Sequence, residues 1–309
     1  MKLKNTLALS LAAVMAAGLT ACGSGADTAS AASPAADSTA AESTEAAADT
    51  TAAPDGDGDP TTLTVAMECA YAPYNWTQND DANGAVEIRG SSDYAYGYDV
   101  MMAKKIGEAL GQKVQIVKLD WDSLIPAVMS GDVDCVIAGQ SITAERAAQV
   151  DFSDPYYYAS IVTLTKKDSA YANAASVADL AGATATSQLG TIWYDTCLPQ
   201  IEDANVLSAT ANAPDMLMSL NAGKCDIVVT DQPTGKGALI AYPDFVMLDF
   251  GGAEGDFQVT DEEINIGISM KKGNTELKSA IDGVLSKMTK DDYSKIMDEA
   301  IAVQPLANQ

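Results

Sequence analysis

Polar and aromatic side chains gather directly after the predicted strands of this chain, and their types fit the binding of a small charged molecule. They fall in five short segments, at residues 68–74, 120–126, 139–146, 188–191 and 230–231. Together the segments supply one cation, several hydroxyl groups, helix N–H groups, aromatic rings and carboxylates. A zwitterion with an apolar stem needs this combination, because each buried charge requires an opposite partner and the stem requires a nonpolar surface.

The composition excludes several other kinds of site. The chain has no histidine, which removes Ser-His-Asp and Cys-His catalysis and the commonest zinc ligand. Neither glycine-rich phosphate-binding pattern occurs, and the cysteine spacings match no metal pattern. The formal net charge of −25 disfavours binding to nucleic acid or to anionic lipid surfaces. We therefore expect no cofactor, no metal and no nucleic-acid partner.

Alternating strands and helices must position these side chains. Expected strands cover residues 62–67, 114–118, 135–138, 161–166, 183–187, 204–208, 226–230 and 263–270. Expected helices cover residues 98–110, 121–130, 191–198, 213–221, 275–288 and 291–302, and one more begins at 176–180. This alternation predicts βαβ units, parallel sheets and a two-lobed α/β protein whose final segment returns to the first sheet. Ligands of such folds bind at the carboxyl ends of the strands, where the polar segments lie.

Seven short strings occur in order along the chain. They are Gly97-Tyr98-Asp99-Val100, Leu124-Ile125-Pro126-Ala127, Ser130-Gly131-Asp132-Val133-Asp134, Ser141-Ile142-Thr143-Ala144-Glu145-Arg146, Asp151-Phe152-Ser153-Asp154-Pro155-Tyr156, Gly190-Thr191 and Gly223-Lys224-Cys225-Asp226. Together they resemble the extracellular solute-binding proteins, family 3, of polar amino-acid ABC transporters. The resemblance covers residues 62 to about 301. It implies the type II periplasmic-binding fold, with lobe 1 at residues 61–160 and 263–309, lobe 2 at 161–262, and a ligand cleft between them.

The resemblance assigns the carboxylate end of an amino-acid ligand to one cation and its neighbours. Arg146 matches the arginine that holds the α-carboxylate, and a planar guanidinium pairs bidentately with that group. Ser141 and Gly139 match positions that meet the ligand through hydroxyl and backbone groups. Thr191 matches a second-lobe residue that meets the carboxylate from a helix N-terminus. The alternative is that Arg146 is a surface helix charge paired with Glu145.

The resemblance also assigns the ammonium and the side-chain stem. Asp231 matches the acid that receives the α-ammonium, although a carboxylate at the end of a strand could instead cap the next turn. Tyr71 and Trp121 match two aromatic residues that sandwich the stem, and ordinary packing under a loop is their alternative. Trp121 departs from the usual phenylalanine but keeps a ring face.

Glu68 carries the expectation about ligand identity. It matches an acidic position that touches a polar or cationic side-chain head in several relatives. The remaining expected pocket positions are Ala138, Gln140, Gln188 and Thr230. Because a buried carboxylate needs a donor, we expect arginine, lysine, ornithine or glutamine to bind better than leucine, and glutamate or aspartate to bind worst. Alternatively, Glu68 turns outward and pairs with Lys118 or another surface base.

The N-terminal segment predicts export. A basic start precedes an apolar run at residues 7–19, and Leu19-Thr20-Ala21-Cys22 closes that run. This order is typical of a signal peptide, and the run is too short to span a bilayer. The closing string resembles a bacterial lipobox, which implies a signal peptide at residues 1–21 and a lipid on Cys22. The alternative is an ordinary signal peptide with an incidental cysteine.

Residues 22–60 are expected to form a disordered tether. The segment after the cysteine consists almost entirely of small, hydroxyl-bearing, proline and acidic residues. Such a composition buries too little apolar surface to offset the entropy of ordering, and its unbalanced negative charge keeps it extended. We expect a protein anchored by lipid to the outer face of the bacterial cell membrane.

Four cysteines follow the expected lipidation site: Cys69, Cys135, Cys197 and Cys225. A disulfide between Cys197 and Cys225 is possible in an exported protein. We favour buried free thiols.

The resemblance implies a monomeric receptor, and not an enzyme, that closes its lobes around one free amino acid and meets a membrane permease. The hinge is expected near residues 157–161 and 258–264. One alternative is an enzyme of the cyclohexadienyl dehydratase type, which acts on arogenate or prephenate. The other is a sensor module for a separate signalling partner. The polar connection at residues 75–90 has no assigned role.

Overall fold

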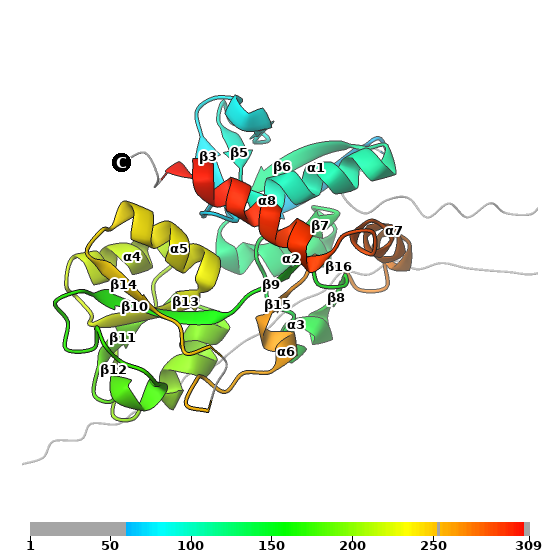
Figure 1. Cartoon of the computed structure of the whole chain (residues 1–309). Helices are drawn as coiled ribbons and strands as arrows, with labels where there is room; N and C mark the ends of the chain where they lie inside the picture. The colour runs from blue at the N-terminus through cyan, green and yellow to red at the C-terminus, as the bar shows by residue number, and fades with distance from the viewer. Residues whose placement is uncertain (1–59, 252–253, 306–309) are drawn as a thin grey trace, which may run out of the picture. The chain divides into compact units, whose positions relative to one another are not determined.

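The computed structural model describes residues 60–251 and 254–305 (Figure 1). The expected signal peptide, Cys22 and the tether up to residue 59 lie outside the described residues. Within the part of the chain that the structure describes, no helix is long and apolar enough to cross a membrane.

A five-stranded sheet forms the first lobe, in the order β6-β1-β7-β16-β8. Its strands are β1 Thr62–Met67, β6 Lys113–Lys118, β7 Cys135–Val136, β8 Val150–Phe152 and β16 Ser269–Lys271. The strands β6, β1 and β7 run parallel, whereas β16 runs antiparallel to β7 and β8. Helices of this lobe are α1 Tyr98–Leu110, α2 Leu124–Ser130, α3 Ala144–Gln149, α7 Thr275–Leu285 and α8 Lys290–Val303. In Figure 1, α8 lies beside α1, and the two helices are in contact.

A second five-stranded sheet forms the second lobe, in the order β12-β11-β13-β10-β14. Its strands are β10 Ile161–Lys166, β11 Thr184–Thr186, β12 Asn205–Val206, β13 Ile227–Asp231 and β14 Phe245–Leu248. Here β11 runs parallel to β12 and β13, and β10 runs antiparallel to β13 and β14. The helices are α4 Ala213–Asn221 and α5 Gln232–Ala241.

The chain passes twice between the two sheets. The first passage contains β9 Tyr157–Tyr158, and the second contains α6 Asp261–Ile264 and β15 Asn265–Ile266. The two passages pair as an antiparallel ribbon of β15 and β9. They coincide with the segments expected to act as the hinge.

A small antiparallel sheet, in the order β2-β3-β5-β4, was not expected from the sequence. Its strands are β2 Ala70–Tyr71, β3 Asn75–Gln78, β4 Val86–Glu87 and β5 Tyr94–Tyr96, and the connection contains the short 3-10 turn Ala82–Gly84. Strands this short show no readable alternation of polar and apolar residues. The ring of Trp76 packs edge-on against Tyr96, with centroids 5.4 Å apart. This sheet uses the polar connection at residues 75–90 to support the strand that carries Tyr71.

The expected strand at residues 263–270 is wrong in its first part. Thr260 accepts a hydrogen bond from the backbone of Glu263, whose carboxylate accepts one from the backbone of Thr260. This capping box starts the short helix α6 where a strand was expected. Only after α6 does the chain extend into β15 and β16.

Two expected helices have other geometries. Residues 176–180 form a 3-10 turn at Val177–Leu180. The expected helix at 191–198 is a π turn at Trp193–Cys197 followed by a 3-10 turn at Leu198–Gln200. Pro199 lies within that second turn and cannot donate a backbone hydrogen bond, so a regular α-helix is disfavoured there. The expected helix at 121–130 begins as the 3-10 turn Trp121–Ser123 before α2.

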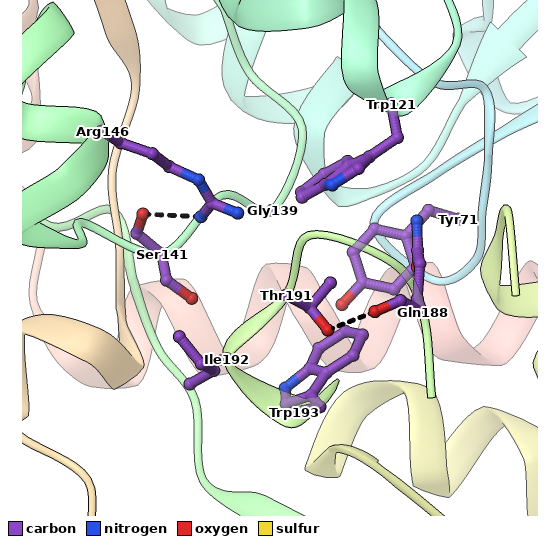
Figure 2. Close-up of a pocket in the computed structure, with 9 residues that line it drawn as sticks. All are labelled: Tyr71, Trp121, Gly139, Ser141, Arg146, Gln188, Thr191, Ile192 and Trp193. Atoms are coloured by element: carbon purple, nitrogen blue, oxygen red, sulfur yellow. Dashed lines mark hydrogen bonds between the residues drawn. The ribbon is translucent and has the colours of Figure 1, made fainter. Parts of the chain in front are cut away.

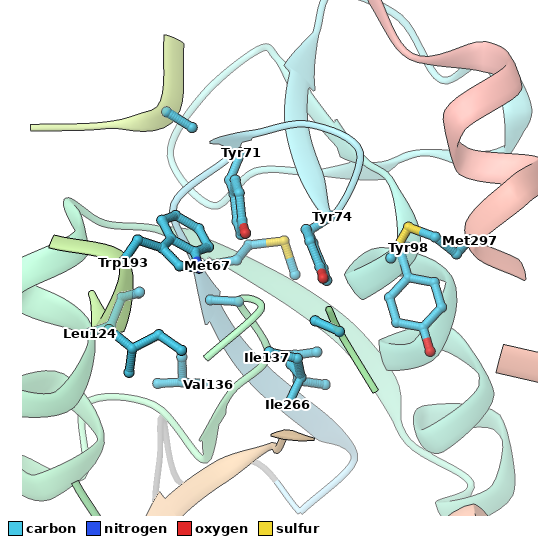
Figure 3. Close-up of a cluster of buried hydrophobic side chains, with 14 of the residues drawn as sticks. Met67, Tyr71, Tyr74, Tyr98, Leu124, Val136, Ile137, Trp193, Ile266 and Met297 are labelled. Carbon is cyan, nitrogen blue, oxygen red and sulfur yellow. The ribbon is translucent and has the colours of Figure 1, made fainter. Parts of the chain in front are cut away.

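The buried core continues from the strands into the aromatic residues above them (Figure 3). The aliphatic side chains of Val136 in β7 and of Ile137 directly after it are fully buried. The rings of Tyr71 and Tyr74 stack above them with centroids 4.7 Å apart. The four described cysteines are buried free thiols, so the disulfide considered between Cys197 and Cys225 is not formed.

Candidate ligand-binding site

Loops that follow the strands of both sheets surround a small cavity (Figure 2). Its lining comprises Tyr71, Trp121, Gly139, Ser141, Arg146, Gln188, Thr191, Ile192 and Trp193. The first five come from the first lobe and the last four from the second. The cavity volume is about 10 Å³, which is room for about one water molecule. An amino acid can therefore enter only when the surrounding loops move apart.

Arg146 connects the two lobes through its guanidinium group. Nη1 donates a hydrogen bond to the Ser141 carbonyl at 2.9 Å, and Nη2 donates one to the Gly190 carbonyl at 2.8 Å. The guanidinium also lies over the Trp121 ring, 5.3 Å from its centroid. Figure 2 shows the guanidinium pointing toward the cavity. The local reason is Thr143, which caps the N-terminus of α3 and so fixes the turn that presents the arginine.

Burial lowers the pKa of the Arg146 guanidinium to about 10, and the charges of Glu145 and Asp195 oppose this shift. The group therefore stays cationic at neutral pH.

Asp231 lies at the end of β13 and is buried, with 2 % of its surface exposed. Oδ2 accepts a hydrogen bond from the Tyr71 hydroxyl, and Oδ1 accepts one from the Thr234 backbone at 2.9 Å. The second bond caps α5, so the capping alternative considered for this residue holds for one of its two oxygens. Burial raises the pKa of the carboxyl to about 6, and the hydrogen bonds from Tyr71 and Thr234 limit the rise.

Glu68 lies directly after β1 and turns inward. It is 6 % exposed, and its Oε2 accepts a hydrogen bond from Gln188 Nε2 at 3.5 Å. Lys118, the alternative partner, donates instead to the Thr77 hydroxyl at 3.0 Å. Burial raises the pKa of the Glu68 carboxyl to about 7, opposed by Gln188 and Lys118 and assisted by Asp120 and Asp122.

The structure brings seven of the twelve expected ligand-binding residues to the cavity wall and leaves five outside it. Two of those five are hydrogen-bonded to residues that line the cavity. Glu68 accepts a hydrogen bond from Gln188, and Asp231 accepts one from Tyr71. Gln140 accepts a hydrogen bond from Ser269 at 3.0 Å and lines a larger adjoining groove. Ala138 and Thr230 are fully buried.

Ile192 and Trp193 line the cavity but were not among the expected ligand-binding residues. They directly follow Thr191, whose hydroxyl donates to the Gln188 carbonyl at 2.7 Å. This bond turns the chain so that its next two side chains face inward. The available sequence signal was the helix expected at 191–198, because its N-terminal residue Thr191 was already expected at the site.

A wider groove of about 550 Å³ adjoins the cavity and shares Trp121, Arg146, Thr191 and Ile192 with it. Four carboxylates line the groove: Asp122, Glu145, Asp195 and Glu263. The arrangement places a negative vestibule outside a single inward-facing guanidinium. Such a field favours the approach of cations over anions.

The family model for bacterial extracellular solute-binding proteins, family 3, matches residues 63–302. The chain belongs to this family. The expected two-lobed α/β fold of the type II periplasmic-binding class, with its cleft between the lobes, is confirmed by the two sheets and by the solved structures described next.

Named relatives of this solute-binding chain bind amino acids. A "Probable histidine-binding protein" from Campylobacter jejuni is 31 % identical over 188 residues, covering 60 % of this chain and 67 % of that protein. The amino acid ABC transporter substrate-binding protein AbpA from Streptococcus pneumoniae, bound to L-arginine, is 26 % identical with a TM-score of 0.65, covering 78 % of this chain and 94 % of the other. An ancestral amino-acid-binding protein, described as a precursor of cyclohexadienyl dehydratase, is 30 % identical with a TM-score of 0.63, covering 78 % and 96 %.

Proposed function

We propose that this protein is the extracellular substrate-binding component of an amino-acid ABC importer. The observation that carries the proposal is Arg146, a half-buried cation whose two terminal nitrogens each donate a hydrogen bond to a carbonyl, one from each lobe. A ligand carboxylate can replace both carbonyls as acceptor, because a guanidinium fork matches the two oxygens of a carboxylate. Ligand binding would then change the hydrogen bonds that Arg146 makes to both lobes at once.

The other end of the ligand would lie toward Asp231. An α-ammonium is the natural partner of a carboxylate that burial otherwise destabilises. Trp121 would cover the apolar stem together with Tyr71, whose other face is occupied by Tyr74. Because Arg146 belongs to the first lobe and Asp231 to the second, a zwitterion that touches both stabilises the closed arrangement.

The ligand class is polar or cationic. Glu68 accepts only one long hydrogen bond, from Gln188 at 3.5 Å, so a guanidinium, ammonium or amide head would supply a better donor. A relative 26 % identical to this chain holds L-arginine. The acidic groove outside the cavity also favours cations.

A thermal-shift screen against the twenty amino acids tests the function. A ligand at 100 times its dissociation constant should stabilise the protein by about 2.7 kcal/mol. Calorimetry should then give arginine or glutamine as ligands, leucine as a weak one and glutamate as the weakest. Tight binding of leucine or glutamate, with arginine and glutamine silent, would show that the assignment of Glu68 is wrong.

An enzyme is the second candidate, because one relative is described as a precursor of cyclohexadienyl dehydratase. We propose that this chain binds without catalysis, since the Tyr71 hydroxyl and the Thr234 backbone already engage Asp231, which leaves Glu68 as the inward-turned carboxyl with one long hydrogen bond. Formation of phenylpyruvate from prephenate by the purified protein would support the enzyme instead.

Export and anchoring complete the proposal. The family is described as extracellular, and the lipobox string supports attachment of the mature protein through Cys22. The folded lobes would act as a monomer, hold one free amino acid and offer the closed surface to a membrane permease. A sensor role would require a signalling partner in place of the permease, which co-purification from membranes would identify.

A further inference from the structure

Asp99 is a buried carboxylate outside the cavity wall that connects to the loops of the site. It lies in the first turn of α1 and is fully buried. Its Oδ1 accepts a hydrogen bond from the Tyr156 hydroxyl at 2.6 Å, and its Oδ2 accepts one from Asn75 Nδ2 at 2.7 Å. Each oxygen is therefore committed to a different neighbour.

Each of these neighbours holds the backbone of a different site loop. Asn75 Oδ1 accepts a hydrogen bond from the Cys69 N–H at 2.6 Å, and the Tyr156 hydroxyl accepts one from the Gly139 N–H at 3.0 Å. Cys69 directly follows Glu68, and Gly139 itself lines the cavity. One carboxylate thus reaches both loops through one intervening side chain each.

Both held residues have left-handed backbone conformations. The φ angle is 54° at Cys69 and 65° at Gly139. A residue with a Cβ disfavours this region, so Cys69 needs an external constraint to stay there. At Gly139 an added Cβ would lie 2.7 Å from Tyr71 Cε1, so the two loops touch at this point. A small rotation of either loop would therefore move Tyr71.

The direction of the hydrogen bonds depends on Asp99. Two series of hydrogen bonds end at the carboxylate. In the first, Cys69 donates to Asn75, which donates to Asp99. In the second, Gly139 donates to Tyr156, which donates to Asp99. Above its pKa, which burial raises to about 7, Asp99 is a carboxylate that only accepts, so it can end two such series of hydrogen bonds. A carboxamide at position 99 would turn one acceptor into a donor and reverse or break one series.

We propose that Asp99 is a positioning residue that fixes the Glu68–Tyr71 loop and the Gly139–Ser141 loop together and thereby sets ligand affinity. The effect on affinity rests on the proposed amino-acid binding, whereas the effect on the two loops does not. Asp99 belongs to the string Gly97-Tyr98-Asp99-Val100. This string would thus contribute to the site, although its position at the start of a helix does not indicate such a role.

Asp99→Asn tests this with Asp134→Asn as a matched control. Asp134 is also a buried acid of the first lobe, and it accepts hydrogen bonds from the backbone and hydroxyl of Thr64 at 2.7 and 2.5 Å. It precedes β7, whereas Gly139 follows that strand, so the two acids serve opposite ends of the sheet. Both variants lose a buried carboxylate, but only one loses the loop connection.

The first readout is amide hydrogen exchange at pH 8, where Asp99 is mostly ionised, in the absence of added amino acid. Asp99→Asn should accelerate exchange at Cys69 or Gly139, and Asp134→Asn should leave both amides as in the wild type. Tyr156→Phe should accelerate exchange at the Gly139 amide only. This variant provides a test of the proposal if Asp99→Asn does not fold. Wild-type exchange at Gly139 in the Tyr156→Phe variant, or at both amides in Asp99→Asn, would overturn the proposal.

The second readout is calorimetry with L-arginine and L-glutamine. Asp99→Asn should weaken the binding of whichever ligand the wild type accepts by about tenfold, as loss of an outer supporting hydrogen bond does at metal sites, with unchanged stoichiometry. A merely structural role would lower the stoichiometry through unfolding and leave the dissociation constant intact, and that result would refute the effect on affinity. If the wild type bound none of the twenty amino acids, the proposed function would fail and the exchange experiment would still decide the role of Asp99.

Discussion

The Tyr71 hydroxyl donates a hydrogen bond to the Asp231 carboxylate and so joins the small sheet beside the first lobe to the last residue of β13 in the second. An ammonium that approaches Asp231 meets an oxygen already engaged by this hydroxyl. Tyr71 therefore both lines the cavity and regulates how strongly Asp231 attracts a cation.

Removing that hydroxyl should change the titration of Asp231. The bond from Tyr71 favours the ionised carboxylate, so Tyr71→Phe should raise the Asp231 pKa above its present value of about 6. Carbon-13 NMR of the labelled carboxyl group measures this directly. Tyr194→Phe is the control, because that hydroxyl bonds to the Leu207 carbonyl at 2.9 Å. Equal Asp231 pKa values in wild type and Tyr71→Phe would contradict the assigned bond.

Arg146→Ala should leave the protein folded and weaken ligand binding by about 2–5 kcal/mol, as truncation of one partner of a buried charge pair does. Arg89→Ala provides the control, since Arg89 is an exposed arginine of the same lobe that bonds to Gln115 at 3.4 Å. Calorimetry on both variants gives the comparison. Wild-type affinity in Arg146→Ala would remove this residue from the site.

Affinity for a cationic ligand should fall as the pH drops through about 7. Glu68 attracts a cation only when ionised, and its pKa of about 7 means that one unit below this value about nine-tenths of the group is protonated. Binding of L-arginine should therefore weaken about tenfold between pH 8 and pH 6. Glu68→Gln should bind more weakly at pH 8 and lose this step. An unchanged step in the variant would assign the titration to another group.

Stability without ligand should show the opposite trend. Burial raises the pKa values of Glu68 and Asp99 to about 7 from ordinary values of 4.5 and 3.8. The folded state then binds more protons than the unfolded state between about pH 4 and 7, so stability is lost as the pH rises through that window. The unfolding temperature should be higher at pH 5 than at pH 8, and Glu68→Gln should reduce the difference. A higher unfolding temperature at pH 8 would show that these carboxyls are not protonated in the fold.

Cys22→Ala should abolish labelling of the protein by a lipid precursor in cells and leave it soluble or unprocessed. Cys225→Ala should keep the label, because that cysteine is a buried thiol of the second lobe. Gel fluorescence after metabolic labelling distinguishes the two variants. A lipid signal that persists in Cys22→Ala would rule out the lipobox.

The sequence predicted some elements in full but missed others, among them the helices α3 and α5, although Thr143 and Asp231 cap them. The helix at 98–110 matches α1 because its apolar spacing ends at Gly111, which adopts the left-handed conformation with φ of 69°. The strands at 62–67 and 161–166 match β1 and β10 in full. The small sheet and the π turn were missed, because they depend on contacts of Trp76 and Thr191 that only the folded chain provides.

Several residues of the site could be predicted from the sequence, but the hydrogen bonds between them could not. Family strings led to Arg146, Ser141 and Thr191. The partners of Asp231 and Glu68 lie 160 and 120 positions away in the chain, so no local pattern connects them. The same holds for the hydrogen bonds of Asp99, since Asn75 and Tyr156 reach this residue only when the lobe has formed.

The small size of the cavity has a kinetic consequence. With room for about one water molecule, the cavity holds an amino acid only after its walls have moved apart, and we expect release to require the same motion. Its residence time is then governed by how often the lobes separate, and hardly by the ligand's own diffusion. Ligands that stabilise the closed arrangement more should therefore depart more slowly, while opening from outside, as by a docked permease, would shorten the residence of all of them.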